Sequence, residues 1–457
     1  MINSLRNSVG HINTRLKTIH PRTQNALLNS FWGLLIKGGG MAINLVMVPL
    51  TLSCLDNSTF GVWTTLSSLL MLLAFFDIGL GNGLRNKLAV ALSTNDIGLA
   101  QSYVSTAYVM FGGIQLILIA LFTITNTIIP WATILNTTVP NSTLKNLALV
   151  LFTGISIKLL LDLLTFVLYA RQESAKANLL IFLTNLLSLL GLLILIHFKE
   201  GNLFSLGIIT AFSPVFLLII ASIFLYKGSL KHIRPFIYLY RREHVKSLLG
   251  IGSKFFLVQI AVIVIFYSDN LIITQLFGPT EVTSYNIAFR YFNVINTLFA
   301  IVIAPYWSAF TEAHMKGEYH WMRTIYRRLW WFWAGAVGLV IVGIIFASSV
   351  YEIWVGDRVQ IPTMLNVCMG LSVIVACFNN VAVVVINGLG KIKLQLILSF
   401  LSATINIPLC VFLGKHLNMG STGVILATSL SLLCGSVGSV LQAHRLLNRS
   451  ATGIWAK

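Results

Sequence analysis

The sequence is poor in charged residues, and acidic residues are especially scarce. Only 13 of its 457 residues are Asp or Glu, against 31 Lys and Arg, and the charged types together make up 10% of the chain. Soluble domains carry roughly 25% charged residues. Together with 56% hydrophobic residues and a mean hydropathy of +0.85, this composition excludes an ordinary soluble protein and indicates a membrane protein.

Several sequence patterns are also missing. Alternating strands of the membrane-barrel type do not occur, so helices remain the only way to span a bilayer. The five cysteines are scattered through apolar segments without a C-x-x-C spacing, which indicates small core residues and no metal site. No ATP motif occurs, and no cofactor is expected.

Long apolar segments recur along the whole chain. A helix of about 20 residues crosses a hydrocarbon core about 30 Å thick. The segments predict an all-α polytopic membrane protein with about twelve transmembrane helices. A basic connector at 227–247 divides them into an N-terminal lobe at 1–226 and a C-terminal lobe at 248–457, each with six spans. The predicted spans are 27–53, 59–79, 101–129, 146–169, 177–197, 205–226, 248–275, 283–305, 325–350, 363–387, 392–413 and 420–444.

The basic residues gather on one set of loops. On the side that holds both chain ends there are 23 Lys and Arg, and the opposite loops hold four. By the positive-inside rule the first side is cytoplasmic, so both termini face the cytoplasm. Nucleic acid is not an expected partner, because its binding would need one soluble basic patch. The connector either lies on the anionic leaflet as a short amphipathic segment or only sets topology.

Four cations lie well inside predicted spans, at least six residues from either end: Lys37, Lys158, Lys254 and Arg290. An ionisable group in a span costs at least about 2.5–3.5 kcal/mol, so it usually faces a protein interior or a wet cavity. We expect these cations to line a central cavity that binds an anionic, hydroxyl-rich cargo, although Lys254 is shallow enough to snorkel to the interface. Polar residues that would hydrogen-bond hydroxyls are Asn44, Gln115, Asn185, Gln259 and Asn293.

Two acids also lie inside spans. Asp162 follows Lys158 by four residues, which places both on one helix face where they can pair. Asp269 and Arg290 flank the turn between the seventh and eighth spans at similar depth, which predicts a structural salt bridge. Alternatively, Asp162 or Asp269 carries a coupling ion.

The stretch FFDIGLGNGLRNKLA, residues 75–89, follows the second span. Its glycines do not make G-x-G-x-x-G, because position 84 is Leu, so nucleotide binding is not supported. The stretch leaves the membrane on the cytoplasmic side, where glycines permit tight turning and close helix approach. We predict a cytoplasmic hinge or gate, made by Asp77, Gly79, Gly81, Gly83 and Arg85.

The motif FDIGLGNGLRNKLA resembles the signature after the second helix of Wzx-type oligosaccharide flippases, of the multidrug/oligosaccharidyl-lipid/polysaccharide (MOP) exporter superfamily. SKFFLVQIAVIVIFYSDNLIITQLFGPTEVTSYNIAFRYF, residues 253–292, resembles their span 7 to 8 region. The resemblance implies two six-helix lobes around a central cavity in the bacterial inner membrane. It also implies movement of a polyprenyl-diphosphate-linked oligosaccharide, an O-antigen or capsule repeat unit, to the outer leaflet by alternating access. Membrane lipids, a coupling ion (H⁺ or Na⁺) and polysaccharide polymerase machinery would be its partners.

Three other functions compete with a flippase. A drug exporter of the same superfamily would prefer intramembrane acids for cationic cargo, yet intramembrane cations outnumber acids four to two. A polysaccharide polymerase or ligase would need acid/base groups, but outer loops 130–145 and 351–362 hold no paired carboxylates or His cluster. A scaffold protein would not explain Lys37 or Lys158. We therefore expect a transporter and not an enzyme, in which Lys37→Ala and Lys158→Ala each abolish transport.

Overall fold

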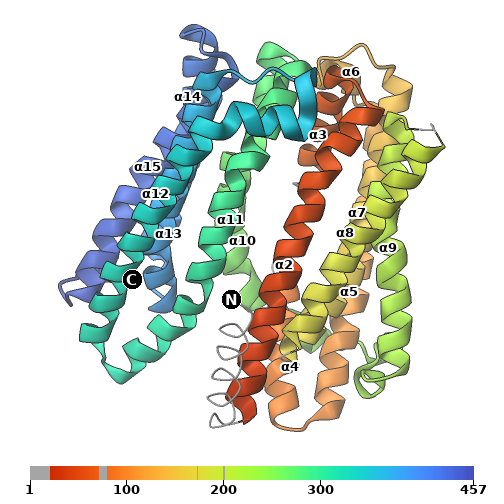
Figure 1. Cartoon of the computed structure of the whole chain (residues 1–457). Helices are drawn as coiled ribbons and strands as arrows, with labels where there is room; N and C mark the ends of the chain where they lie inside the picture. The colour runs from red at the N-terminus through yellow and green to blue at the C-terminus, as the bar shows by residue number, and fades with distance from the viewer. Residues whose placement is uncertain (1–20, 72–79, 172, 199–200, 457) are drawn as a thin grey trace, which may run out of the picture.

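The computed structural model describes residues 21–71, 80–171, 173–198 and 201–456 (Figure 1). Within these ranges the regular structure is helical, which confirms the predicted all-α fold. Nine described helices are long and apolar enough to cross a membrane. Three further helices, Pro21–Cys54, Asn57–Met71 and Arg242–Phe277, lie where the first, second and seventh spans were predicted.

The helices follow one another with short connections. The first set is α2 (Pro21–Cys54), α3 (Asn57–Met71), α4 (Leu80–Ser93), α5 (Ile97–Asn126), α6 (Trp131–Ile134), α7 (Asn141–Ala170), α8 (Ser174–His197) and α9 (Leu203–Lys227). Two 3₁₀ turns, η2 (Lys231–Ile233) and η3 (Ile237–Leu239), lie in the connector. The second set is α10 (Arg242–Phe277), α11 (Pro279–Lys316), α12 (Tyr319–Val355), α13 (Thr363–Gly388), α14 (Lys393–Val411) and α15 (Gly420–Leu447).

Local sequence sets several helix ends. The Asp96 side chain accepts a hydrogen bond from the Leu99 amide and caps α5, and Asn202 with Ser205 forms a capping box on α9. Gly278 has a φ of +90°, a backbone conformation that favours glycine, and it is followed by a proline at the first turn of α11. This tight turn sets α10 and α11 antiparallel to each other.

Three apolar cores hold the helices together. One is formed entirely by residues between 273 and 447, and a second joins α4, α5, α7 and the connector to Leu248 at the start of α10. A third core, which includes Val48 and Leu66, also contains Ile287 and Tyr351 from the second set. The two sets, on the right and left of Figure 1, are thus joined by a shared core. The division into lobes at residues 226 and 248 stays a prediction.

Hydrogen bonds between the two sets concentrate at the helix ends that carry few basic residues. The Trp354 indole donates to the Leu45 carbonyl at 2.9 Å, and the Thr283 hydroxyl donates to the Asn57 carbonyl at 2.6 Å. Further bonds at this end join Arg358 to Leu52 (3.1 Å), Thr65 to Thr274 (2.7 Å) and Asn270 to Ser68 (2.7 Å). These hydrogen bonds join the two sets at the end that the positive-inside rule predicts to be outside.

Candidate functional site

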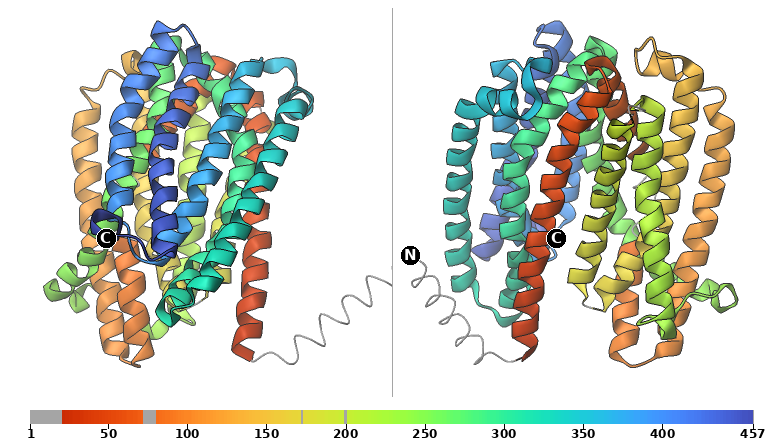
Figure 2. Two further views of the ribbon diagram at one scale, coloured as in Figure 1. Left: turned by 90° about the vertical axis from the view of Figure 1, so that its left-hand side faces the viewer. Right: turned by 45° about the vertical axis from the view of Figure 1, so that its right-hand side comes forward.

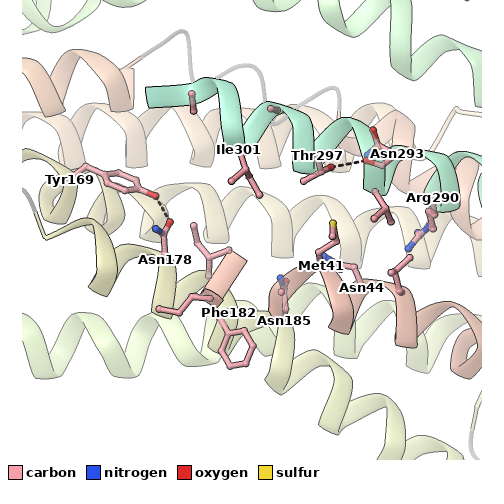
Figure 3. A pocket seen from close by; sticks show the side chains of 17 residues that line it. Met41, Asn44, Tyr169, Asn178, Phe182, Asn185, Arg290, Asn293, Thr297 and Ile301 are labelled. Atoms are coloured by element: carbon pink, nitrogen blue, oxygen red, sulfur yellow. Dashed lines mark hydrogen bonds between the residues drawn. The ribbon is translucent and has the colours of Figure 1, made fainter. Parts of the chain in front are cut away.

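A cavity of about 580 Å³ lies between the two sets of helices (Figure 3). Its walls come from α2, α7 and α8 of the first set and from α11 of the second. Such a volume is typical of small-molecule sites, which often lie between helices of a bundle. A molecule bound in this cavity would therefore contact both sets of helices.

Arg290 is the one charged side chain among the 17 described residues that line this cavity. It lies at one end of the lining, and Tyr169 lies toward the other end (Figure 3). The remaining polar groups are mostly amides, and the walls between them are apolar. The polar lining residues other than Arg290 are Asn44, Tyr169, Asn178, Asn185, Asn293 and Thr297.

Helical periodicity places these groups on the cavity face of α11. Arg290, Asn293, Thr297 and Ile301 follow one another at three- and four-residue steps, so they share one face. Arg290 is 11 residues after Pro279, which at about 1.5 Å per residue puts it roughly 17 Å from the start of the helix. In a hydrocarbon core about 30 Å thick that begins near Pro279, this distance would place its charge near the middle.

The predicted polar lining is partly found. Asn44, Asn185, Asn293 and Arg290 line the cavity. Gln115 instead is buried on α5, and it is not among the lining residues that the structure describes. The side chains of Lys37, Lys254 and Gln259 lie outside the described part of the chain, although their backbones belong to α2 and α10.

Lys158 and Asp162 form an ion pair on α7, with 2.5 Å between Nζ and Oδ2. The prediction that they pair is confirmed. Neither residue is among the described residues of the cavity lining. Their side chains are only 39% and 23% exposed, so each charge offsets the cost that the other would pay in an apolar environment.

The predicted salt bridge between Asp269 and Arg290 is wrong. The Asp269 carboxylate instead accepts hydrogen bonds from the Tyr285 hydroxyl at 2.7 Å and from the Thr428 hydroxyl at 3.1 Å. None of the ion pairs in the described ranges contains Asp269 or Arg290. Tyr285 and Arg290 are five residues apart on α11, so they point in directions about 140° apart. Tyr285 faces α10, whereas Arg290 faces the cavity.

The glycine-rich motif is helical where it is described. Asp77 and Gly79 lie outside the described residues, but Gly81 and Gly83 are buried inside helix α4 and make no turn. A Cβ atom on Gly83 would lie 2.0 Å from the Leu248 carbonyl oxygen of α10. Arg85 lies over the Tyr169 ring at 5.4 Å. Close helix approach is thus confirmed and tight turning at these glycines is wrong, while the gate stays a proposal.

The turn between α7 and α8 is held by charges beside the cavity. Glu173 pairs with Arg171 at 2.9 Å and with Lys176 at 2.8 Å. Partial burial raises the pKa of Glu173, but the hydrogen bonds and charges of Lys176 and Arg171 lower it by more. The net pKa is therefore below its ordinary value. Glu173 therefore stays charged at neutral pH and neutralises part of the basic loop.

The sequence-based prediction missed Asn178 and Tyr169. The Tyr169 hydroxyl donates to Asn178 Oδ1 at 3.2 Å at the cavity wall (Figure 3). Asn178 precedes Asn185 by seven residues, a spacing that puts both on one face of α8. This seven-residue spacing could have placed Asn178 on the same helix face as Asn185, but Asn178 lies at the predicted start of a span and was not predicted to line the cavity.

A double substitution separates a structural role of the α7 ion pair from a role in cargo binding. We expect Lys158→Met with Asp162→Leu to keep most transport activity, because the pair lies off the described cavity lining and apolar replacements remove both partly buried charges together. Lys158→Met alone should lower the amount of folded protein, because it leaves Asp162 unpaired. Transport assays normalised to membrane protein level measure both effects. Complete loss of transport in a well-folded double variant would instead indicate that Lys158 takes part in cargo binding.

Comparisons with known proteins bear on the same fold. No protein-family model matches the sequence. The chain is 22% identical over 282 residues to a candidate O-antigen transporter of Salmonella typhimurium, covering 61% of this chain and 63% of that protein. It is 21% identical over 313 residues to a candidate O-antigen transporter of Salmonella typhi, covering 66% and 68%. The alignment to the first relative thus spans less than two thirds of its length.

Solved structures of MOP-superfamily transporters share the fold. An inward-facing multidrug resistance MATE transporter gives a TM-score of 0.77 at 16% identity, covering 92% of this chain and 98% of the other. An outward-facing form gives 0.65 at 17% identity, covering 95% and 98%. A MOP transporter of Pyrococcus furiosus, described as having a binding pocket of reverse polarity, gives 0.64 at 14%, covering 93% and 95%. These findings confirm the resemblance to Wzx-type proteins of the MOP superfamily and the predicted fold class.

Proposed function

We propose that this chain, a multi-pass membrane protein with the MOP transporter fold, is a flippase for a polyprenyl-diphosphate-linked oligosaccharide. It would carry an O-antigen or capsule repeat unit from the cytoplasmic to the outer leaflet of the bacterial inner membrane. The observation that carries the proposal is Arg290, a cation in a cavity between the two sets of helices with no acidic residue among the described lining.

The charge of the cavity favours an anionic cargo. A guanidinium binds phosphate oxygens through two parallel hydrogen bonds, which are stronger when water is excluded. A cationic drug would instead need a carboxylate in the lining, and the described lining has none. The same cavity thus supports a diphosphate and weighs against the drug-exporter alternative.

The amides beside Arg290 suit the sugar part of the cargo. Asn44, Asn178, Asn185 and Asn293 carry amide donors and acceptors that match sugar hydroxyl groups, although Asn178 Oδ1 already accepts from Tyr169 and Asn293 Oδ1 from Asn296. Apolar residues between them would contact sugar ring faces. A cavity of about 580 Å³ holds the head group, while the polyprenyl chain stays in the bilayer.

Alternating access is supported by the closure of one end. The hydrogen bonds of Trp354, Arg358 and Thr283 to the first set of helices close the predicted outer end. Cargo would enter the cavity from the cytoplasmic side in this state. The TM-score is correspondingly higher against the inward-facing relative, 0.77, than against the outward-facing form, 0.65.

Ion coupling through Asp269 is part of the proposal. Asp269 is 2% exposed, and its carboxylate accepts hydrogen bonds from Tyr285 and Thr428. None of the ion pairs among the described residues contains Asp269. A buried carboxylate of this kind is costly unless it takes up a proton or a cation. Binding of H⁺ or Na⁺ there would change the charge inside the second set of helices during the transport cycle.

The experiment that tests the function locates the lipid-linked oligosaccharide by leaflet. The gene is deleted in its host, and a labelled sugar precursor reports which face of the membrane holds the single repeat unit. We expect unpolymerised units to accumulate on the cytoplasmic face. If single units instead reach the outer leaflet and only polymerisation stops, the protein is a polymerase and the flippase proposal fails.

A further inference from the structure

A second, smaller pocket lies at the cytoplasmic end of α9, away from the central cavity. It has a volume of about 280 Å³ and is formed where the last turns of α9 meet the connector. Its described lining consists of Ser222, Ile223, Tyr226, Lys227, Arg234 and Pro235. The central cavity shares none of these residues, so the role of the small pocket is independent of the proposed flippase function.

Two cations meet in this pocket without an acid. Lys227 is at the end of α9, and Arg234 follows η2 in the connector. Neither takes part in an ion pair among the described residues. The Ser222 hydroxyl oxygen also lies buried with no hydrogen-bond partner there. Two positive charges and a free hydroxyl donor are the groups that bind a phosphate.

The connector is held in place, so Arg234 is positioned and not free. The Gln101 side-chain amide donates to the Arg234 carbonyl at 2.9 Å. The Phe236 amide donates to the Ser105 hydroxyl at 3.1 Å, and the Arg241 amide donates to the Thr106 hydroxyl at 3.1 Å. All three partners lie on α5. This anchoring reduces the entropy lost when Arg234 binds a ligand.

Apolar side chains continue from the pocket in two directions. Along α9, Phe216, Ile219 and Ile223 are exposed and precede Lys227 at three- and four-residue steps, which places them on the same helix face. On the connector, Ile237 is 82% exposed and Tyr238 is 75% exposed. Figure 2 shows that the connector projects sideways from the bundle near its lower end. An exposed aromatic and aliphatic edge beside basic residues is typical of a segment that lies in the membrane interface.

We propose that this pocket binds the head group of an anionic phospholipid of the cytoplasmic leaflet. The phosphate lies between Lys227 and Arg234 and accepts a hydrogen bond from Ser222. The acyl chains run up the exposed apolar side of α9, and Ile237 and Tyr238 enter the interface beside the head group. A free phosphate ion shares the first contact but makes none of the apolar ones, and this difference separates the two ligands.

The test measures lipid binding to the purified full chain by native mass spectrometry. Phosphatidylglycerol is titrated against the wild type and against the Lys227→Gln/Arg234→Gln variant, with phosphatidylcholine as the lipid without net charge. We expect the wild type to prefer phosphatidylglycerol and the variant to bind it about thirtyfold more weakly, a loss of about 2 kcal/mol from two basic residues near the lipid surface.

The matched control is Lys231→Gln with Arg242→Gln, which removes the same charge from the exposed connector outside the pocket. It should keep the wild-type affinity. Equal weakening in both double variants, or no preference of the wild type for phosphatidylglycerol over phosphatidylcholine, overturns the proposal. Displacement of the lipid by inorganic phosphate at equal concentration also overturns it, because the apolar contacts of the lipid would then add nothing to binding. The lipid preference of the wild type decides the matter even if a variant does not fold.

Discussion

Arg290→Ala should lower transport by roughly tenfold to a hundredfold while the protein reaches the membrane in normal amounts. The substitution removes the one charge of the described cavity lining, and a charge-assisted hydrogen bond contributes about 1.5–3 kcal/mol. Loss of one such contact alone lowers cargo binding by roughly tenfold to a hundredfold. Folding should not suffer, because no ion pair of the described residues depends on Arg290. Arg290→Lys should keep part of the activity, since the charge remains but the planar fork is lost.

The measurement is the amount of outer-leaflet repeat unit, normalised to the amount of protein in the membrane. Arg327→Ala is the matched control, because Arg327 is an exposed arginine on α12 outside the cavity lining. It should transport like the wild type. Normal transport by Arg290→Ala would exclude the cavity as an anion site and leave the flippase assignment without its main support.

The same geometry predicts the result of a double variant. Were Asp269 and Arg290 a salt bridge, removing Arg290 would partly rescue Asp269→Ala. Because Asp269 contacts Tyr285 and Thr428 while Arg290 faces the cavity, we expect no rescue. Absence of rescue would agree with the separate roles that we propose, ion coupling for Asp269 and cargo binding for Arg290.

The fold was accessible from sequence because the bilayer limits what a chain can do. Apolar length alone specifies helices that are able to span a membrane, and the loop charges predict their direction. The polar cavity residues Asn44, Asn185, Asn293 and Arg290 were found for the same reason, since an amide or charge in an apolar segment needs a polar environment. Composition is informative here because the membrane makes polarity costly.

What sequence reasoning did not give is which face of a helix a residue occupies relative to a partner far away in the chain. Asp269 and Arg290 have matching depths. Asp269 contacts Tyr285 of α11, however, and the side chains of Tyr285 and Arg290 point about 140° apart around that helix, so Arg290 faces the cavity and not Asp269. Lys158 was assigned to the cavity because it is deep, whereas α7 presents it to Asp162. Depth follows from counting residues, but orientation follows from packing.

Close approaches between distant segments were equally hidden. Gly61 lies in α3 with no signal in the surrounding sequence, yet it contacts the backbone of Pro279 at the start of α11. A Cβ atom at position 61 would lie 1.7 Å from the Pro279 carbonyl oxygen, far inside any permitted contact. Backbone cannot rotate away as a side chain can, so α3 and α11 would have to separate. This contact is close to the hydrogen bond from Thr283 to the Asn57 carbonyl at the closed end.

Gly61→Ala should therefore disfavour the state in which the outer end is closed and reduce transport by roughly fivefold to a hundredfold, since overpacking a tight contact costs about 1–3 kcal/mol. Thr274, buried at this contact and bonded to Thr65, is replaced by cysteine in a chain that lacks its five native cysteines. A membrane-impermeant thiol reagent added from outside should label it faster in the Gly61→Ala variant. Gly113→Ala is the control, because a Cβ there meets nothing within 4 Å. Unchanged labelling together with unchanged transport would show that the two helices do not need this contact to close. Loss of the protein from the membrane would show that the contact stabilises the fold in every state, and not the closed state alone.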